Sequence, residues 1–184
     1  MTRRARRRHS VVRVIARRTM YQGRVIRLVR EVLQVRDRRL VRETILHPGA
    51  VVIIPRVDRS HLVFIRQYRR AVGRTLLELP AGTLDPPESP RVCAQRELEE
   101  ETGFRAKRLR RVGAFYPAPG LLSEQMTLFL ADGLTPGPAH PEADEMIRPV
   151  VLSLREAMAK IRSGAICDAK TILGVWFVRG LSRR

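Results

Sequence analysis

The sequence predicts a single α/β domain built on a mixed β-sheet. Strand-like segments occupy most of the first two-thirds of the chain, one strong helix signal interrupts them, and helical segments close the chain. The length of 184 residues is that of one domain. With 44% hydrophobic and 29% charged residues, the composition is ordinary for a folded globular protein and argues against disorder.

Strands are expected on both sides of the central helix. Residues 25–35 alternate apolar and basic side chains, with one slip that a bulge would explain, and residues 37–39 turn the chain into a second strand over 40–46. The continuous apolar run 50–55 is typical of a buried strand. Further strands are expected over 62–68, 76–79, 110–115, 126–131 and 150–152.

The central helix has clear signals at both ends. Ser89 is a suitable N-cap, Pro90 suits the first helical position, and Gly103 is the expected stop. Two loops and two closing helices complete the expected elements: the loops over 80–82 and 135–145, and the helices over 154–161 and 171–181.

The charge of the chain is strongly positive. Thirty-six Lys and Arg face eighteen Asp and Glu, which gives a net charge of +18, and all but three of the basic residues are arginines. Such a charge attracts anionic ligands or nucleic acid without choosing between them. We expect residues 1–18 to form a solvated basic arm; a nucleic-acid-binding arm is the alternative.

Membrane insertion and disulfide bonding are not expected. No apolar run approaches the ~18 residues that a membrane span requires, and the basic start is not followed by a secretory apolar segment. Cys93 and Cys167 lie far apart and lack metal-ligand spacing, so we expect reduced thiols in a cytoplasmic protein.

The central helix carries an acidic cluster near its C-terminal end. Glu97, Glu100 and Glu101 share one face, because they are spaced at i, i+3 and i+4. Like charges at this spacing destabilise a helix, and the helix dipole disfavours negative charge at this end. The cluster therefore indicates a bound cation, and hard oxygen ligands favour Mg²⁺ or Mn²⁺. A solvated acidic face is the alternative interpretation.

The wider spacing favours the metal site. Gly82 is followed after five residues by Glu88, and after seven more by the run Arg96-Glu-Leu-Glu-Glu-Glu-Thr-Gly103. This pattern matches every fixed position of the Nudix box, so the chain resembles Nudix hydrolases. Further segments are similar to the ADP-ribose pyrophosphatase branch, from residue 19 to the C-terminus: 21–23, 42–43, 47–51, 67–69, 78–82, 116–120, 123–124 and 168–171, with Pro119 fifteen residues after Phe104.

The resemblance implies a fold, a domain organisation and an assembly. The expected Nudix fold has a mixed β-sheet sandwiched between helices and an N-terminal region of antiparallel β-strands. Residues 49–184 would form the hydrolase domain. Residues 19–48 would form the N-terminal β region and dimerise, so a homodimer is expected.

The resemblance also implies a metal site. Two or three Mg²⁺ or Mn²⁺ ions would be held by the carboxylates of Glu97, Glu100 and Glu101 and by the backbone carbonyl of Ala81. Four residues are implied to be structural or orienting: Gly82, Glu88, Arg96 and Gly103.

The catalytic and substrate-binding residues are implied in the same way. The general base would be a glutamate on a late loop, either Glu142 or Glu145, which alignment by eye does not separate. Phosphate and nucleoside contacts are expected from Arg42, Arg69, Glu78 and Pro119. The implied reaction hydrolyses the pyrophosphate bond of ADP-ribose and releases AMP and ribose 5-phosphate.

Other substrates remain as alternatives. The branch often stacks adenine on an aromatic residue just after Tyr-x-Gly, where this chain has Arg24 and Val25. GDP-mannose and related nucleotide sugars are therefore the nearest alternatives. An RNA 5′-end pyrophosphohydrolase or a nucleic-acid-binding Nudix protein would suit the charge, but aromatics make up only 5% of the chain, and stacking platforms need them.

Overall fold

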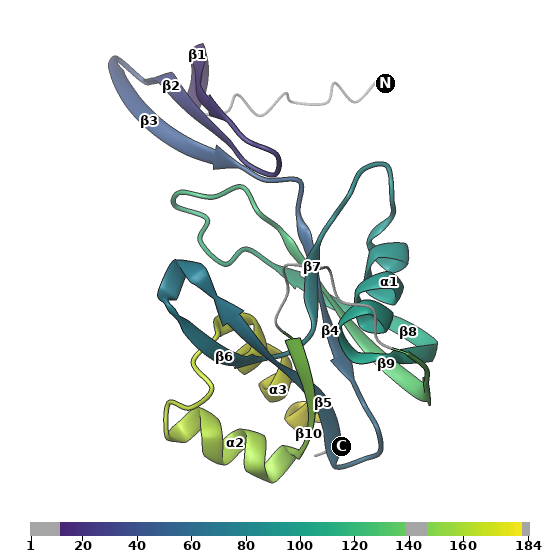
Figure 1. Cartoon of the computed structure of the whole chain (residues 1–184). Helices are drawn as coiled ribbons and strands as arrows, with labels where there is room; N and C mark the ends of the chain where they lie inside the picture. The colour runs from purple at the N-terminus through teal and green to yellow at the C-terminus, as the bar shows by residue number, and fades with distance from the viewer. Residues whose placement is uncertain (1–11, 139–146, 182–184) are drawn as a thin grey trace, which may run out of the picture. The chain divides into compact units, whose positions relative to one another are not determined.

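The computed structural model describes residues 12–138 and 147–181 (Figure 1). The described chain divides into two compact units. The first comprises the N-terminal strands as far as His47 together with Ala118–Ser123. The second comprises Pro48–Pro117 and the remainder of the chain from Glu124 onward. Each unit is described by itself.

The first unit is an antiparallel sheet in the order β1-β2-β3, formed by Val12–Gln22, Arg27–Val35 and Arg38–Leu46. The buried Glu31 on β2 accepts hydrogen bonds from side chains on both neighbouring strands. Arg17 donates to it at 2.8 Å, and the Thr44 hydroxyl donates to it at 3.4 Å. The sheet confirms the expected N-terminal antiparallel region.

Strand β1 differs from the expected solvated arm. From Val12 onward the chain pairs with β2 along its length, with register shifts between Val14 and Ala16 and between Thr19 and Tyr21. Every residue of β1 is exposed, and arginines interrupt its apolar pattern. The strand is therefore held by backbone pairing and by the Arg17–Glu31 ion pair rather than by burial. Hydrophobic periodicity does not detect a strand that is held in this way.

The second unit contains a four-stranded mixed sheet in the order β7-β4-β9-β8 (Figure 1). Its central pair, β4 and β9, is parallel, and the outer pairs are antiparallel. All six residues of β4 are buried, as expected for its continuous apolar run. The four strands are Ala81–Thr83 (β7), Ala50–Pro55 (β4), Met126–Pro136 (β9) and Phe104–Phe115 (β8).

A second, antiparallel sheet lies in the same unit, in the order β10-β5-β6. Its strands are Ile147–Ser153 (β10), His61–Arg69 (β5) and Arg74–Glu78 (β6). A short 3₁₀ turn, Arg70–Val72, joins β5 to β6. Only Leu79 and Pro80 separate β6 from β7, so most of the loop expected over residues 80–82 is part of strand β7.

Three helices complete the unit: α1 (Pro90–Thr102), α2 (Leu154–Arg162) and α3 (Ala169–Leu181). The four-stranded sheet has an apolar cluster on each face. Val51 and Ile53 pack with α1, whereas Val52 and Ile54 pack with the second sheet, α2 and α3. At Gly174 helix α3 approaches the sheet closely, because an added Cβ would lie 2.4 Å from the Leu79 side chain.

This arrangement confirms the expected α/β fold with a mixed sheet between helices. The expected strands and helices are all present, although β8 and β9 extend beyond the apolar segments that predicted them. None of the helices in the described part of the chain has the length and apolarity needed to cross a lipid bilayer.

Candidate active site

The loop from β6 to β7 brings the chain against helix α1. The Pro80 carbonyl accepts a hydrogen bond from the Ile53 N–H at 2.9 Å, and the Ala81 N–H donates to Glu101 Oε2 at 3.0 Å. At Gly82 the backbone is so close to Glu97 that an added Cβ would lie 1.9 Å from its carboxylate carbon. Gly82 is therefore the residue that lets the Glu97 carboxylate reach the loop.

Helix α1 is capped as the sequence predicts. The Ser89 hydroxyl accepts from the Val92 N–H at 3.4 Å, and Pro90 is the first helical residue. Gly103 ends the helix in the left-handed conformation, with φ of 71°, and its N–H donates to the Glu99 carbonyl at 2.9 Å. These two caps fix where the acidic segment begins and ends.

Arg96 is the central cation of the acidic cluster. Its Nη2 lies 2.8 Å from Glu88 Oε1, and its Nη1 lies 2.8 Å from both Glu97 Oε1 and Glu100 Oε2. The hydrogen bond from Arg96 lowers the pKa of Glu88 to about 2, and the same bond raises the pKa of Arg96. Glu88 also accepts from the Asp85 N–H at 3.0 Å, so it ties the loop before α1 to the helix.

The cluster contains more negative than positive groups. Three carboxyl groups, those of Glu88, Glu97 and Glu100, contact the single guanidinium of Arg96, and that of Glu101 binds the neighbouring Ala81 N–H. Glu101 is 2% exposed, and the side chains of Glu97 and Glu88 are only 12% and 14% exposed. Excess negative charge held away from water is unfavourable unless a cation compensates it. The donor set, all carboxylate oxygen with a nearby backbone carbonyl, fits Mg²⁺ or Mn²⁺.

The carboxylates do not yet converge on one point. Within residues 12–138 and 147–181, no three acidic, histidine or cysteine side chains are disposed to hold a metal ion as they stand. The contacts show the reason: Glu97 and Glu100 turn to Arg96, while Glu101 turns to the Ala81 N–H. Binding a cation here requires these side chains to exchange their present donors for the ion.

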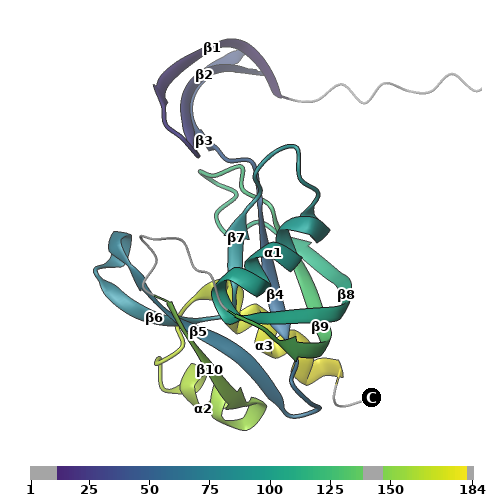
Figure 2. The ribbon, with the colours of Figure 1, turned by 45° about the vertical axis from the view of Figure 1, so that its right-hand side comes forward.

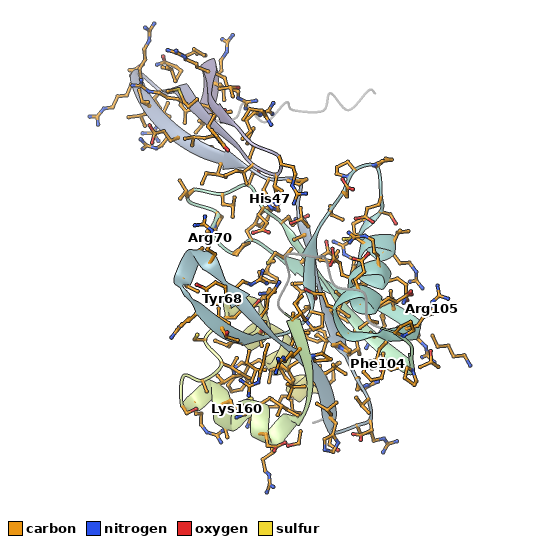
Figure 3. The ribbon with its side chains drawn as sticks, in the orientation of Figure 1. His47, Tyr68, Arg70, Phe104, Arg105 and Lys160 are labelled. Atoms are coloured by element: carbon orange, nitrogen blue, oxygen red, sulfur yellow. The ribbon has the colours of Figure 1, made fainter. Side chains whose placement is uncertain are left out.

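The outer face of α1 borders a cleft of about 870 Å³. Arg96 and Glu100 reach its edge, and the strand ends of β8 and β9 form its other wall. Glu99 lines the cleft from the α1 side and accepts hydrogen bonds from Gln95 and from Arg105, at 2.7 and 2.8 Å. Figure 3 shows Arg105 where β8 begins, beside the end of α1. Glu99 thus faces its own cation and stands apart from the cluster around Gly82.

A second ionic group lies at the other end of the same loop. Glu78, 1% exposed, accepts a bidentate pair from Arg69, at 2.9 and 2.8 Å, and an ion pair from Lys170. Burial alone would raise the pKa of Glu78, but the hydrogen bond from Arg69 and the charge of Lys170 hold it below its ordinary value. Lys170 also pairs with Asp168 at 3.0 Å.

Helix α3 is connected to the loop through this group. The Thr171 hydroxyl donates to Asp168 at 2.6 Å and accepts from the Leu79 N–H at 2.7 Å. Glu78, Leu79 and Ala81 are therefore each anchored, the first two by α3 and the third by α1. Neither Lys170 nor Thr171 was expected in the site, although a lysine in the first turn of a mainly apolar helix was a usable signal.

The residues expected to bind substrate or act as general base are not gathered in one described site. Both oxygens of Glu78 are engaged by protein cations, and Arg69 directs two of its nitrogens at Glu78. In the first unit, Arg42 is exposed on β3 and donates to the Val41 carbonyl, and Pro119 is exposed in a loop. Glu142 and Glu145, the alternative general bases, lie outside the described residues.

Comparison with known proteins identifies the family. The NUDIX domain model matches residues 46–172. The chain is 35% identical to the ADP-ribose pyrophosphatase of Bacillus subtilis (strain 168) over 91% of its own length and 92% of the relative's. It is 36% identical to the GDP-mannose pyrophosphatase of Cronobacter sakazakii over 68% and 70% of the two chains. A crystal structure of an ADP compounds hydrolase superposes with a TM-score of 0.83 and 27% identity, covering 94% of both chains.

These matches confirm the expected resemblance, including its ADP-ribose pyrophosphatase branch. The matched region contains Gly82, the acidic cluster of α1 and the anchored loop between β6 and β7. The chain therefore belongs to the Nudix family and is a Nudix hydrolase.

Proposed function

We propose that the protein hydrolyses the pyrophosphate bond of a nucleoside diphosphate sugar, and that ADP-ribose is its substrate. Water adds across the phosphorus–oxygen–phosphorus bridge, so ADP-ribose yields AMP and ribose 5-phosphate. The observation that carries the proposal is the group of four carboxyl groups around Arg96 and Gly82, built by a complete Nudix box. The nucleotide-sugar pyrophosphatases among its relatives support the substrate class.

The metal ligands would be Glu97, Glu100, Glu101 and the Ala81 carbonyl, with two or three Mg²⁺ or Mn²⁺ ions. When bound, the ions supply positive charge to the diphosphate and make the attacking water easier to deprotonate. Glu101 is the most constrained of the proposed ligands, because it is buried and hydrogen-bonded to the loop. Its carboxylate therefore has to exchange the Ala81 N–H for the ion while the helix keeps it beside the loop.

The other residues would orient the ligands and move the proton. Arg96, fixed by Glu88, holds Glu97 and Glu100 in place before the ions bind. Glu142 or Glu145 would accept the proton of the attacking water, because a carboxylate can act as general base and the family resemblance implies a glutamate base on this late loop. A phosphate contact from Arg42, with Pro119 near the substrate, completes the proposed machinery.

Arg69 is proposed as a phosphate contact that Glu78 holds in position. Arg69 uses Nε and Nη2 for Glu78 and has a side chain that is 38% exposed. Its outward side can thus meet a phosphate oxygen while the inner side stays paired. Because Glu78 is buried and doubly paired, we propose that it acts through Arg69 rather than by touching the nucleoside.

GDP-mannose is the second candidate substrate. The relative from Cronobacter sakazakii is named for it, and Arg24 and Val25 stand where the ADP-ribose branch often has an aromatic residue. An RNA-directed activity is not favoured, because aromatic side chains are scarce in the chain.

We also propose a cytoplasmic homodimer. Strand β1 is an edge strand whose apolar side chains Val12, Val14, Ile15 and Met20 are all between 42% and 49% exposed. Exposed apolar groups on an edge strand favour association with a second copy. Cys93 and Cys167 are both free thiols, which suits a reducing compartment. Light scattering of the purified protein measures the assembly, and a monomer would contradict it.

A substrate panel tests the proposed function. ADP-ribose, GDP-mannose, NADH, a diadenosine polyphosphate and capped RNA are each assayed with Mg²⁺ and with Mn²⁺, and products are separated by chromatography. We expect the highest kcat/KM for ADP-ribose, with AMP and ribose 5-phosphate in equal amounts. A higher kcat/KM for GDP-mannose would transfer the proposal to the second substrate. Cleavage of capped RNA alone would reject both.

A further inference from the structure

Helices α2 and α3 border a small, open hollow outside the candidate active site. Its volume is about 270 Å³, and it is lined by Leu154, Arg155, Met158, Arg162 and Arg179. Figures 1 and 2 both show α2 at the opposite end of the second unit from α1. The hollow therefore shares no lining residue with the acidic cluster or with the Glu78 group.

The two helices direct three arginines to this hollow. Arg155, Met158 and Arg162 follow one another at i, i+3 and i+7 on α2, so they share one face. The Met158 side chain is 6% exposed and forms an apolar floor. Arg179 reaches the hollow from the last turn of α3, and its guanidinium stacks over the Trp176 ring at 4.8 Å from the ring centroid. Stacking restricts where Arg179 can place its donors.

The acidic side chains of the same elements are engaged elsewhere. Glu156, on α2, accepts from both the backbone and the hydroxyl of Ser153, at 2.8 and 2.6 Å. Asp168, before α3, binds Lys170 and Thr171. Within the part of the chain that the structure describes, no ion pair joins an acid to any of the three arginines. The hollow is thus a concentrated positive site.

Helix stability accounts for two of these arginines but not for the third. Arg162 and Arg179 lie in last turns, where the helix dipole favours a cation. Arg155 lies in the first turn of α2, where the dipole opposes a positive charge. The N-terminal end of α2 would itself favour an anion, so an anion in the hollow would offset the cost of Arg155.

We propose that the hollow between α2 and α3 binds the phosphate group of a small phosphate-bearing anion. A guanidinium group can donate two parallel hydrogen bonds to phosphate oxygens. Three arginine side chains, those of Arg155, Arg162 and Arg179, line the hollow. Pockets for drug-sized ligands measure ~300–1,000 Å³, so a hollow of about 270 Å³ suits a phosphate with at most a small organic group.

Calorimetric titration of the full chain tests the proposal. Inorganic phosphate and glycerol 3-phosphate are titrated separately, with EDTA present so that the metal-dependent site cannot hold them. The test variant is Arg155→Gln/Arg162→Gln. The matched control is Arg108→Gln/Arg110→Gln, which removes the same charge from exposed positions on β8. Circular dichroism checks that each variant is folded, and the hydrolysis rate should be unchanged in both.

The wild type and the control should bind at least one probe, and the test variant should bind it about tenfold more weakly or worse, since hydrogen bonds between charged groups are lost. Binding of phosphate alone would assign the hollow to the free ion, and tighter binding of glycerol 3-phosphate would assign it to a phosphomonoester. Equal weakening in the control would show that the overall charge attracts the probe. That result, or no binding to the wild type, would overturn the proposal, whatever the substrate of the hydrolase.

Discussion

Helices α1 and α2 begin in the same way and end very differently. Both are capped by a serine whose hydroxyl accepts a backbone N–H, Ser89 for α1 and Ser153 for α2. Helix α2 has Glu156 in its first turn and basic residues in its last turn, as the helix dipole favours, with Arg155 as the exception. Helix α1 has no acid in its first turn, no base in its last turn, and four glutamates near its C-terminal end.

The difference shows which helix the fold uses for chemistry. Helix α2 combines a local capping box with the burial of Ala157 and Met158 in the core. Helix α1 is held by tertiary contacts: Cys93, Ala94 and Leu98 are fully buried against the sheet, and Arg96 neutralises part of the acidic cluster. Functional sites are where local preferences are expected to be violated, at a cost that the surrounding structure offsets. Substitutions in the acidic segment of α1 should therefore lower the activity of the enzyme, and substitutions at the cap of α2 should lower its stability.

The largest expected effect follows from Glu101→Gln. The amide can still accept the Ala81 N–H, so the fold is retained, but a neutral group cannot hold a divalent ion as the carboxylate does. We expect kcat/KM to fall about 10³-fold, equivalent to ~4 kcal/mol of transition-state stabilisation, with little change in Tm. Steady-state kinetics and thermal unfolding measure the two. Undiminished turnover would remove Glu101 from the metal site.

Gly82→Ala should have the next largest effect. The new methyl group would occupy the place of the Glu97 carboxylate, which is the flexible end of a side chain and can move. We expect the protein to fold and kcat/KM to fall about tenfold to a hundredfold, because Glu97 is displaced from its position beside Arg96. Gly113→Ala is the matched control, since its Cβ would meet nothing within 4 Å. Equal losses in both variants would contradict a specific role for Gly82.

Local signals in the sequence predict this part of the molecule well. The N-cap at Ser89, the stop at Gly103 and the buried strand Ala50–Pro55 all lie where residue type and periodicity indicate them. The shared face of Glu97, Glu100 and Glu101 also follows from helical spacing. The i, i+4 spacing also places Glu100 within reach of Arg96, which the structure confirms, but spacing does not show that Arg96 binds Glu97 as well, because side-chain rotamers are set by tertiary neighbours.

Contacts between distant segments could not be predicted in this way. Glu78 and Lys170 are separated by 92 positions and meet only because α3 packs against the sheet at Gly174. Strand β1 was missed because Arg17 makes its pattern look solvated, whereas Glu31 on the neighbouring strand pairs with that arginine. In both cases the energetic partner lies on another element, and a single sequence carries no signal for the pairing.

Ser153→Ala tests the other side of the comparison. The serine hydroxyl accepts the Glu156 N–H at 3.2 Å, and the Ser153 N–H donates to the Glu156 carboxylate at 2.8 Å, which closes a capping box. Loss of such a cap costs ~1 kcal/mol, so we expect Tm to fall by ~2–4 °C while kcat/KM is unchanged. Ser163→Ala, at the other end of α2, is the control and should lower Tm less. A loss of activity without a loss of stability would contradict the division between the helices.

Glu88→Gln should lower the free energy of unfolding by an amount that depends on pH. Arg96 lowers the pKa of Glu88 to about 2 from the ordinary value of 4.5, so the folded protein releases this proton more readily than the unfolded chain. The carboxylate therefore contributes stability that is fully present above about pH 4.5 and is lost as the pH falls toward 2. Urea unfolding at a series of pH values measures the difference between wild type and variant.

The pH series should separate Glu88, which pairs with Arg96, from Glu99, which pairs with Arg105. The stability difference between wild type and Glu88→Gln should be constant near neutral pH and shrink between about pH 4.5 and about pH 2, because only the wild type gains a proton there. Glu99→Gln removes a charge from the same helix but from a surface pair with Arg105, which contributes only ~0–1 kcal/mol. If the two variants lost stability equally and with the same pH dependence, Glu88 would be a surface charge, and Arg96 would not be the cation that holds α1 together.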